Sequence, residues 1–148
     1  AMAPSTPAAV MEILKYYDYD LKGVEATVIG SSPVVGKPMS IMLLNAGATV
    51  ANTHGKTKDN RLHTMKSELI VSATGALHLV DDSYIPEGAT VIDVGYGYKD
   101  CNPTGDVNYD LVEPIAGAIT PVPGGVGSVT TAVLALQVIK AVGILTGK

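Results

Sequence analysis

Five short apolar runs, separated by segments with helical patterns, constrain the fold of this 148-residue chain more than any other feature. They are rich in valine, isoleucine and leucine, which is typical of strands buried on both faces. The runs cover residues 24–29, 48–51, 69–72, 89–94 and 118–119. Strands that alternate with helices assemble into a parallel sheet with helices on both sides. We therefore predict a Rossmann-like α/β fold, a three-layer αβα sandwich with a mainly parallel sheet, in one domain over residues 1–148.

Two helices are predicted before the second strand. The first begins with Thr6 as its N-cap and Pro7 at the first helical position, and it closes at residues 22–23. The second covers residues 36–43, where apolar side chains recur at helical spacing. Two further stretches have no periodic pattern and are predicted to be ordinary loops: 81–87 and 96–106.

A third, long helix is predicted after Gly127, and it is apolar around most of its circumference. Polar residues interrupt it, so we do not expect it to span a membrane. They are Thr130, Thr131, Gln137 and Lys140. A helix that is apolar all round requires cover on more than one side. We therefore expect either an exposed apolar patch or self-association, and we predict a homodimer.

Composition and charge narrow the class of function. A net charge of −4 argues against a nucleic-acid partner, which normally requires a basic face. The single cysteine, Cys101, cannot form an internal disulfide, and the chain starts without a secretory signal pattern, so we predict a cytoplasmic protein. His63, His78 and Cys101 lack metal-ligand spacing, and no metal site is predicted.

Small or polar residues follow each of the five predicted strands. Ligands of parallel α/β sheets bind at the carboxyl ends of the strands, where these residues lie. The strand ends read Gly30-Ser31-Ser32, Thr53-His54, Ala73-Thr74-Gly75, Asp93-Val94-Gly95 and Thr120-Pro121. Five such ends in succession indicate a binding edge.

Two glycine-rich junctions, residues 30–36 and 120–127, lead from a strand into a helix. The free amides and the dipole at a helix N-terminus favour an anion, and glycines permit close approach of backbone to a ligand. The first junction lacks the usual Gly-x-Gly-x-x-Gly spacing. Both junctions therefore have two interpretations, a phosphate-binding loop or a sharp turn.

The end of the second predicted strand carries no acidic residue to hold an adenine ribose. Basic residues follow instead, at Lys56, Lys58 and Arg61, which suits either a 2′-phosphate or a solvated charged face. His54 is interpreted as a hydrogen-bonded structural group rather than a catalyst. Asp93 is expected to tie Gly95 and the neighbouring loop. For Asp106 we expect a similar role, as a turn-capping carboxylate.

Taken together, the motifs resemble the bifunctional methylenetetrahydrofolate dehydrogenase/methenyltetrahydrofolate cyclohydrolase family. The resemblance covers the chain from about residue 3 onwards, and Pro4-Ser5-Thr6-Pro7 resembles the start of that family's cofactor domain. Its motifs occur here in order as Gly30-x-Ser32-x-x-Val35-Gly36-x-Pro38-Met39, Ala48-Thr49-Val50, His54-x-x-Thr57, Val91-Ile92-Asp93-Val94-Gly95, Gly105-Asp106-Val107 and Thr120 to Gly127.

The resemblance implies an NADP-binding domain, with NAD as the alternative cofactor. In the intact family member, hydride passes from methylenetetrahydrofolate to the nicotinamide, and the methenyl product is then hydrolysed. The cofactor-binding residues implied here are Thr6, Gly30, Ser31, Ser32, Val35, Gly36, Pro38, His54, Gly55, Lys56, Thr57, Ala73, Thr74, Gly75, Asp93, Val94, Gly95, Thr120, Pro123, Gly124, Gly125, Val126 and Gly127.

The chain also departs from the family pattern. The family's folate-binding domain, with its Tyr-x-x-x-Lys motif, has no counterpart here, so we assign no catalytic residue and expect no turnover; a tetrahydrofolate derivative would bind only with that domain. Ala1-Met2 suggests either a cloned fragment or a naturally shortened gene. Ser31 and Gly55 stand where the family commonly has Arg and Ser beside the 2′-phosphate, and Ser128-Val129 replaces Pro-Met. A degenerate homologue that acts as a binding or assembly module is the alternative.

Overall fold

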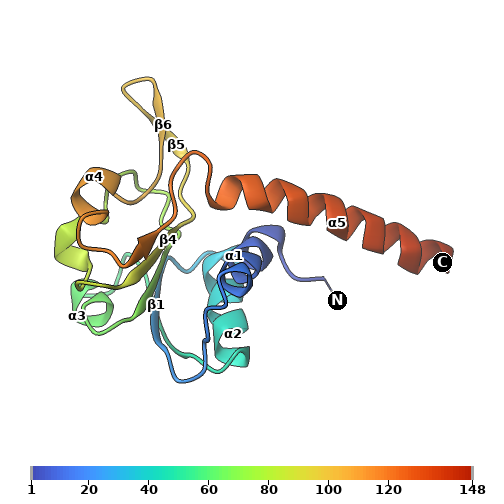
Figure 1. The fold of residues 1–148 in the computed structure, drawn as a ribbon, viewed down its shortest axis with the longest axis horizontal. Helices are drawn as coiled ribbons and strands as arrows, with labels where there is room; N and C mark the ends of the chain where they lie inside the picture. Colours follow the sequence, from blue (N-terminus) through green and yellow to red (C-terminus); the bar gives the residue numbers. More distant parts are fainter. Residues whose placement is uncertain (1, 148) are drawn as a thin grey trace.

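A five-stranded parallel sheet runs through the centre of the computed structural model, which describes residues 2–147 (Figure 1). The strand order is β2-β1-β3-β4-β7, and each neighbouring pair is parallel. The Rossmann-like α/β fold is therefore confirmed. The strands are β1 (Glu25–Ile29), β2 (Thr49–Thr53), β3 (Leu69–Ser72), β4 (Thr90–Asp93) and β7 (Ala118–Ile119).

Helices cover both faces of the sheet, as Figure 1 shows. One face carries α1 (Ser5–Tyr16) and α2 (Gly36–Asn45); the other carries α3 (Arg61–Thr64), the 3-10 turn η1 (Asp82–Tyr84) and α4 (Tyr109–Val112). Alternate residues of β1, β3 and β4 enter two separate apolar cores. Val28 and Val71 pack beneath α1 and α2, whereas Ile29 and Ile70 face Val112 of α4.

The ends of two predicted helices were wrong. Helix α1 already begins at Ser5, so Thr6 lies inside its first turn, and Pro4 at the N-cap makes no side-chain cap bond. The helix ends at Tyr16, well before residues 22–23, because the chain turns at Asp18, whose φ is positive. The last helix, α5 (Val126–Thr146), begins one residue before Gly127, since the buried Val126 already packs into the core.

One predicted loop contains a hairpin instead. Within residues 96–106, β5 (Gly97–Lys99) pairs antiparallel with β6 (Asn102–Thr104). Asp100 and Cys101 form the turn between them, and both have positive φ. The segment was predicted as a loop because it is polar and lacks the alternation that marks a half-buried strand. The other predicted loop, 81–87, contains only the short turn η1.

Helix α5 leaves the body of the domain and ends far from the sheet (Figure 1). It packs along α1, where the Nε2 of Gln137 donates to the carbonyl oxygen of Ala3 at 2.7 Å. Only Val126 and Val133 are buried among its residues. By length and composition alone, α5 also meets the criteria for a membrane-crossing helix, which soluble core helices meet as well.

Candidate functional site

The register of the sheet brings the predicted site residues to one edge. Ile29 pairs with Thr53 and with Ser72, and Ser72 pairs with Asp93. The residues that follow these strand ends therefore lie side by side. Thr120 joins them, because its Oγ1 accepts from the backbone N–H of Asp93 at 2.9 Å. The chain thus has a polar edge at the carboxyl ends of its strands, as predicted from the sequence.

Ser32 organises the junction between β1 and α2. Its Oγ accepts from the backbone N–H groups of Val35 (3.1 Å) and Gly36 (3.3 Å). Its carbonyl oxygen accepts from the backbone N–H group of Lys37. The expectation that the first amides of α2 are free is therefore wrong, because Ser32 already engages them. An anion at this helix N-terminus would compete with Ser32 for the same donors.

Asn52 and His54 fix the loops that flank β2. Asn52 donates its Nδ2 to the carbonyl oxygen of Gly30 at 2.7 Å, which holds the end of β1. The His54 backbone N–H donates to Thr57 Oγ1 at 3.0 Å, and His54 Nδ1 accepts from the Lys56 N–H at 3.3 Å. His54 is thus hydrogen-bonded, as predicted. The sequence indicated only that this strand end lacks an acidic residue, so the positioning role of Asn52 was missed.

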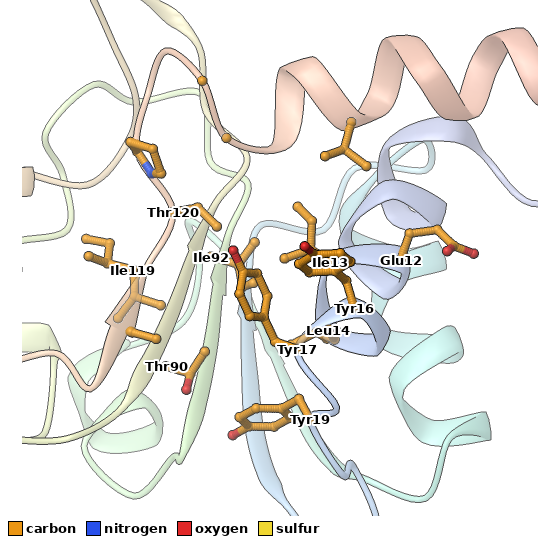
Figure 2. Close-up of a pocket in the computed structure, with 16 residues that line it drawn as sticks. Glu12, Ile13, Leu14, Tyr16, Tyr17, Tyr19, Thr90, Ile92, Ile119 and Thr120 are labelled. Atoms are coloured by element: carbon orange, nitrogen blue, oxygen red, sulfur yellow. The ribbon is translucent and has the colours of Figure 1, made fainter.

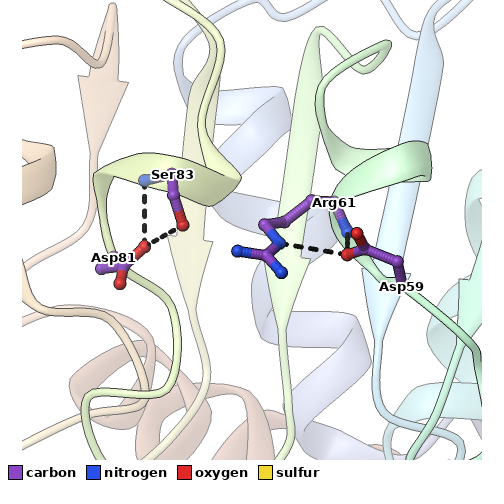
Figure 3. A network of polar contacts seen from close by, with 4 residues as sticks. All are labelled: Asp59, Arg61, Asp81 and Ser83. Atoms are coloured by element: carbon purple, nitrogen blue, oxygen red, sulfur yellow. Dashed lines mark hydrogen bonds and ion pairs between the residues drawn. The ribbon is translucent and has the colours of Figure 1, made fainter.

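Of the three basic residues after β2, Arg61 is already engaged. Its Nε forms an ion pair with Asp59 Oδ1 at 3.1 Å, and its guanidinium carbon lies 5.8 Å from the centroid of the Tyr84 ring. Figure 3 shows this pair beside Asp81, which caps η1 through Ser83. Lys56 and Lys58 are exposed and form no ion pair within residues 2–147. They remain the candidates for contact with a 2′-phosphate.

Two buried carboxylates hold the loops after β3 and β4. Asp93 accepts from the backbone N–H groups of Gly95, Asp106 and Val107 at 2.9 to 3.1 Å. In turn, Asp106 Oδ2 accepts from the N–H of Thr74 at 2.6 Å. The predicted roles of both carboxylates are confirmed. With an exposed fraction of 3%, Asp93 directs its carboxylate into the protein and away from the edge surface.

Burial raises the pKa of Asp93 from its ordinary value of 3.8 to about 6. The three backbone N–H groups oppose this shift because they stabilise the charged form, whereas the negative charge of Asp106 adds to it. The carboxylates pack directly against glycines: a Cβ at Gly95 would collide with Asp106 Oδ1, and one at Gly105 with Asp93 Oδ2. The motifs Asp93-x-Gly95 and Gly105-Asp106 are therefore two halves of one packed unit.

Apart from Gly95, the predicted glycines fall into two groups. For Gly30, Gly36 and Gly125, an added Cβ would strike a backbone carbonyl, so these glycines serve the packing of the chain itself. A second group faces open space: Gly55, Gly75, Gly124 and Gly127. Gly75 and Gly124 also have positive φ, a conformation that favours glycine. Gly55 and Gly127 do not, so neither their backbone conformation nor their packing requires glycine. The space beside these four glycines is therefore open.

A groove of about 730 Å³ begins at the same edge and runs down the face of the sheet. Its upper end is formed by Thr120, Pro121 and Gly124, which belong to the glycine-rich loop. Figure 2 shows tyrosines from α1 and the segment after it on one side, opposite β4 and β7. The groove is therefore adjacent to the predicted site. No group of His, Cys, Asp and Glu side chains within residues 2–147 has the arrangement of a metal site.

Comparison with known proteins identifies a family and relatives that this chain resembles. Residues 4–145 match the family model described as tetrahydrofolate dehydrogenase/cyclohydrolase, NAD(P)-binding domain. The bifunctional protein FolD of Carboxydothermus hydrogenoformans is 50% identical over 147 residues, which is 97% of this chain and 51% of that protein. FolD of Clostridioides difficile is 48% identical over 139 residues. The chain spans about half the length of the curated relatives it matches.

Solved structures agree with this similarity. The bifunctional FolD of Campylobacter jejuni superposes with a TM-score of 0.92 at 45% identity, over 95% of this chain and 50% of that one. The methylenetetrahydrofolate dehydrogenase-cyclohydrolase of Trypanosoma brucei, solved with NADP and an inhibitor, gives 0.83 at 37% identity, over 90% of this chain and 48% of that one.

Proposed function

We propose a function that starts from one fact: this chain belongs to the tetrahydrofolate dehydrogenase/cyclohydrolase family, whose NAD(P)-binding domain it matches from residue 4 to residue 145. We propose that it binds NADP, with NAD as the alternative, across the carboxyl edge of the sheet. The observation that carries this proposal is the parallel register, which gathers five polar strand ends beside open glycines.

The edge offers a distinct environment for each end of the dinucleotide. We assign the adenosine phosphates to Lys56 and to the 30–36 junction, where they would displace Ser32 from the amides of Val35 and Gly36. We assign the nicotinamide to Gly95 and the 120–127 loop. Neutral Asn52 supports NADP over NAD, because a carboxylate at the end of β2 would repel a 2′-phosphate. When bound, the nicotinamide supplies a hydride acceptor; the residues of this chain hold and orient it.

The proposed activity of the whole enzyme is that of a methylenetetrahydrofolate dehydrogenase and methenyltetrahydrofolate cyclohydrolase in one-carbon folate metabolism. We propose that residues 1–148 form its single NAD(P)-binding domain. The folate derivative would bind only together with a folate-binding domain, so we assign no catalytic residue to this chain. With methylenetetrahydrofolate and NADP, the pure chain is expected to give no rise in absorbance at the wavelength of NADPH; clear turnover would refute this.

Isothermal titration with NADP and, separately, with NAD tests the cofactor proposal. Saturable binding of NADP that is tighter than binding of NAD is the expected result. The reverse preference would mean that Ser31 and Gly55 have changed the specificity. A folded sample that binds neither would favour the alternative function, a non-catalytic homologue that serves as a binding or assembly module.

We further propose that the protein is a cytoplasmic homodimer without nucleic-acid or membrane partners. The acidic net charge and the single cysteine support the compartment and the absence of a nucleic-acid partner. The apolar surface of α5 supports self-association: Ile139 and Leu145, for example, are 67% and 85% exposed. Light scattering over a range of protein concentrations tests the dimer, and a single-chain mass throughout would contradict it.

A further inference from the structure

The two buried carboxylates that hold the loops after β3 and β4 lack a cationic partner. Asp93 is 3% exposed and Asp106 is fully buried. Asp93 accepts from three backbone N–H groups. Asp106 accepts from the hydroxyl of Ser72 and from the backbone N–H groups of Thr74 and Gly75. All of these donors are neutral, and no ion pair formed within residues 2–147 includes either carboxylate.

One oxygen of Asp106 also lacks a hydrogen-bond donor. Its Oδ2 takes all the donors, whereas its Oδ1 is buried and has no partner among the described residues. Burying a carboxylate is costly unless a cation or a full set of donors balances it. A Cβ at Gly95 would collide with this Oδ1, so the oxygen lies directly against Gly95. The unbalanced charge is therefore next to the strand end to which we assign the nicotinamide.

The opposite end of the carboxyl edge has the opposite charge. Lys56 and Lys58 follow β2, and both are exposed and outside any ion pair of the described chain. The next cationic residue after Gly95 along the chain is Lys99, which donates to His78 Nδ1 at 3.3 Å rather than to a carboxylate. The residues that the structure describes thus supply no cation to balance Asp93 and Asp106.

We propose that this buried negative charge makes the site prefer the oxidised cofactor, with Asp106 as the main determinant. The oxidised nicotinamide ring carries a positive charge, whereas the reduced ring is neutral and of nearly the same size. Charges inside a protein act more strongly than charges in water, because the effective dielectric constant is lower. Asp106 and Asp93 would therefore favour NADP over NADPH without touching either. This inference rests on the proposed cofactor function and adds a preference between redox states.

Titration of the chain with NADP and, separately, with NADPH tests this preference. Asp106→Asn removes one charge and keeps an oxygen for the N–H groups of Thr74 and Gly75, while its amide nitrogen takes the place of the unpartnered Oδ1. The ratio of the dissociation constant of NADPH to that of NADP is expected to fall by about tenfold. A loss of structure alone would weaken both forms alike and leave this ratio unchanged. Asp110→Asn, the same change at an exposed carboxyl of α4, is the matched control.

The wild-type chain provides a second test that requires no substitution. The pKa of Asp93 is about 6, and Asp106 is the charged residue that acts on it. Protonation of Asp93 removes a negative charge, so the same ratio should fall as the pH is lowered from about 8 to about 5. The 2′-phosphate also titrates there, but both cofactor forms carry it and its effect cancels. In Asp93→Asn this dependence should disappear, which distinguishes the carboxyl from other titratable groups such as His54 and His78.

Two results would overturn the inference while leaving the proposed NADP site intact. One is a ratio that is the same in Asp106→Asn as in Asp110→Asn and the wild type. The other is a wild-type ratio that does not change with pH, and this measurement decides the question if Asp106→Asn fails to fold. A folded wild-type chain that binds neither NADP nor NADPH would instead refute the proposed cofactor function, and this inference with it.

Discussion

The carboxyl edge of the sheet and the helix α5 are built in opposite ways. At the edge, Asp93 bonds to three backbone N–H groups, and Asp106 binds the start of the next loop. Glycines there are fitted against these carboxylates. Along α5, only Val126 and Val133 are buried. The loops at the edge are therefore held by contacts within the chain, whereas α5 presents a largely exposed apolar surface. Mutations should affect folding at the edge and association at α5.

The largest effect is expected where a carboxylate packs against a glycine. Gly95→Ala would push a Cβ into Asp106 Oδ1, and we expect the free energy of unfolding to fall by about 3 kcal/mol or more. Gly127→Ala is the control, because its Cβ would meet open space in the first turn of α5. That change should be neutral or stabilising by up to about 1 kcal/mol. Urea unfolding of both variants measures the difference in the free energy of unfolding. Equal effects would mean that the edge and α5 do not differ in how tightly their glycines are packed.

The pH dependence of stability should report on the same carboxylate. Because the pKa of Asp93 is raised to about 6 in the folded chain, the native state binds this proton more tightly than the unfolded state does. The free energy of unfolding should therefore fall as the pH rises from about 4 to about 6, by up to about 3 kcal/mol.

Asp93→Asn should remove this slope, although it also lowers stability at every pH by exchanging an acceptor for a donor. Asp110→Asn changes an exposed carboxyl of α4 and serves as the comparison. Urea unfolding curves across this pH range measure the slope of the free energy of unfolding against pH. If the slope persists in Asp93→Asn, it arises from the titration of another group.

Cofactor preference should change without a change in stability. Gly55→Ser has open space for its side chain, and Ser31→Arg introduces a guanidinium that can form a charge-assisted bond to phosphate. Together they should tighten NADP by about tenfold and leave NAD nearly unchanged, as measured by titration. Equal gains for both cofactors would place the 2′-phosphate elsewhere.

The smallest effect on folding is expected on α5. Leu136→Ser changes a side chain that is 58% exposed, so the stability of the monomer should change by no more than about 0.5 kcal/mol. Light scattering should nevertheless show weaker self-association than in the wild type. A large loss of stability in a dilute, monomeric sample would mean that α5 is already covered within the chain.

Much of the site could be predicted because strand ends and their small residues are local in sequence. The strands at 69–72 and 118–119 were located to the residue, since continuous apolar runs bounded by glycine or polar residues leave little ambiguity. Asp93 was correctly predicted to bond to Gly95, because a carboxylate at the end of a buried strand requires nearby donors. The role of Asn52 was missed, because its partner Gly30 lies 22 residues earlier and is reached only through strand pairing.

Local patterns along the chain were enough to define the alternation of strands and helices, the polar strand ends and the all-round apolar character of the last helix. These follow from periodicity and from residue chemistry, which act over a few residues. The folded chain was needed to show that Ser32 occupies the amides of α2, that Arg61 is bound to Asp59, and that α5 leaves a groove open beside β4 and β7. Each of these depends on which segments meet in space, and a local pattern does not contain that information.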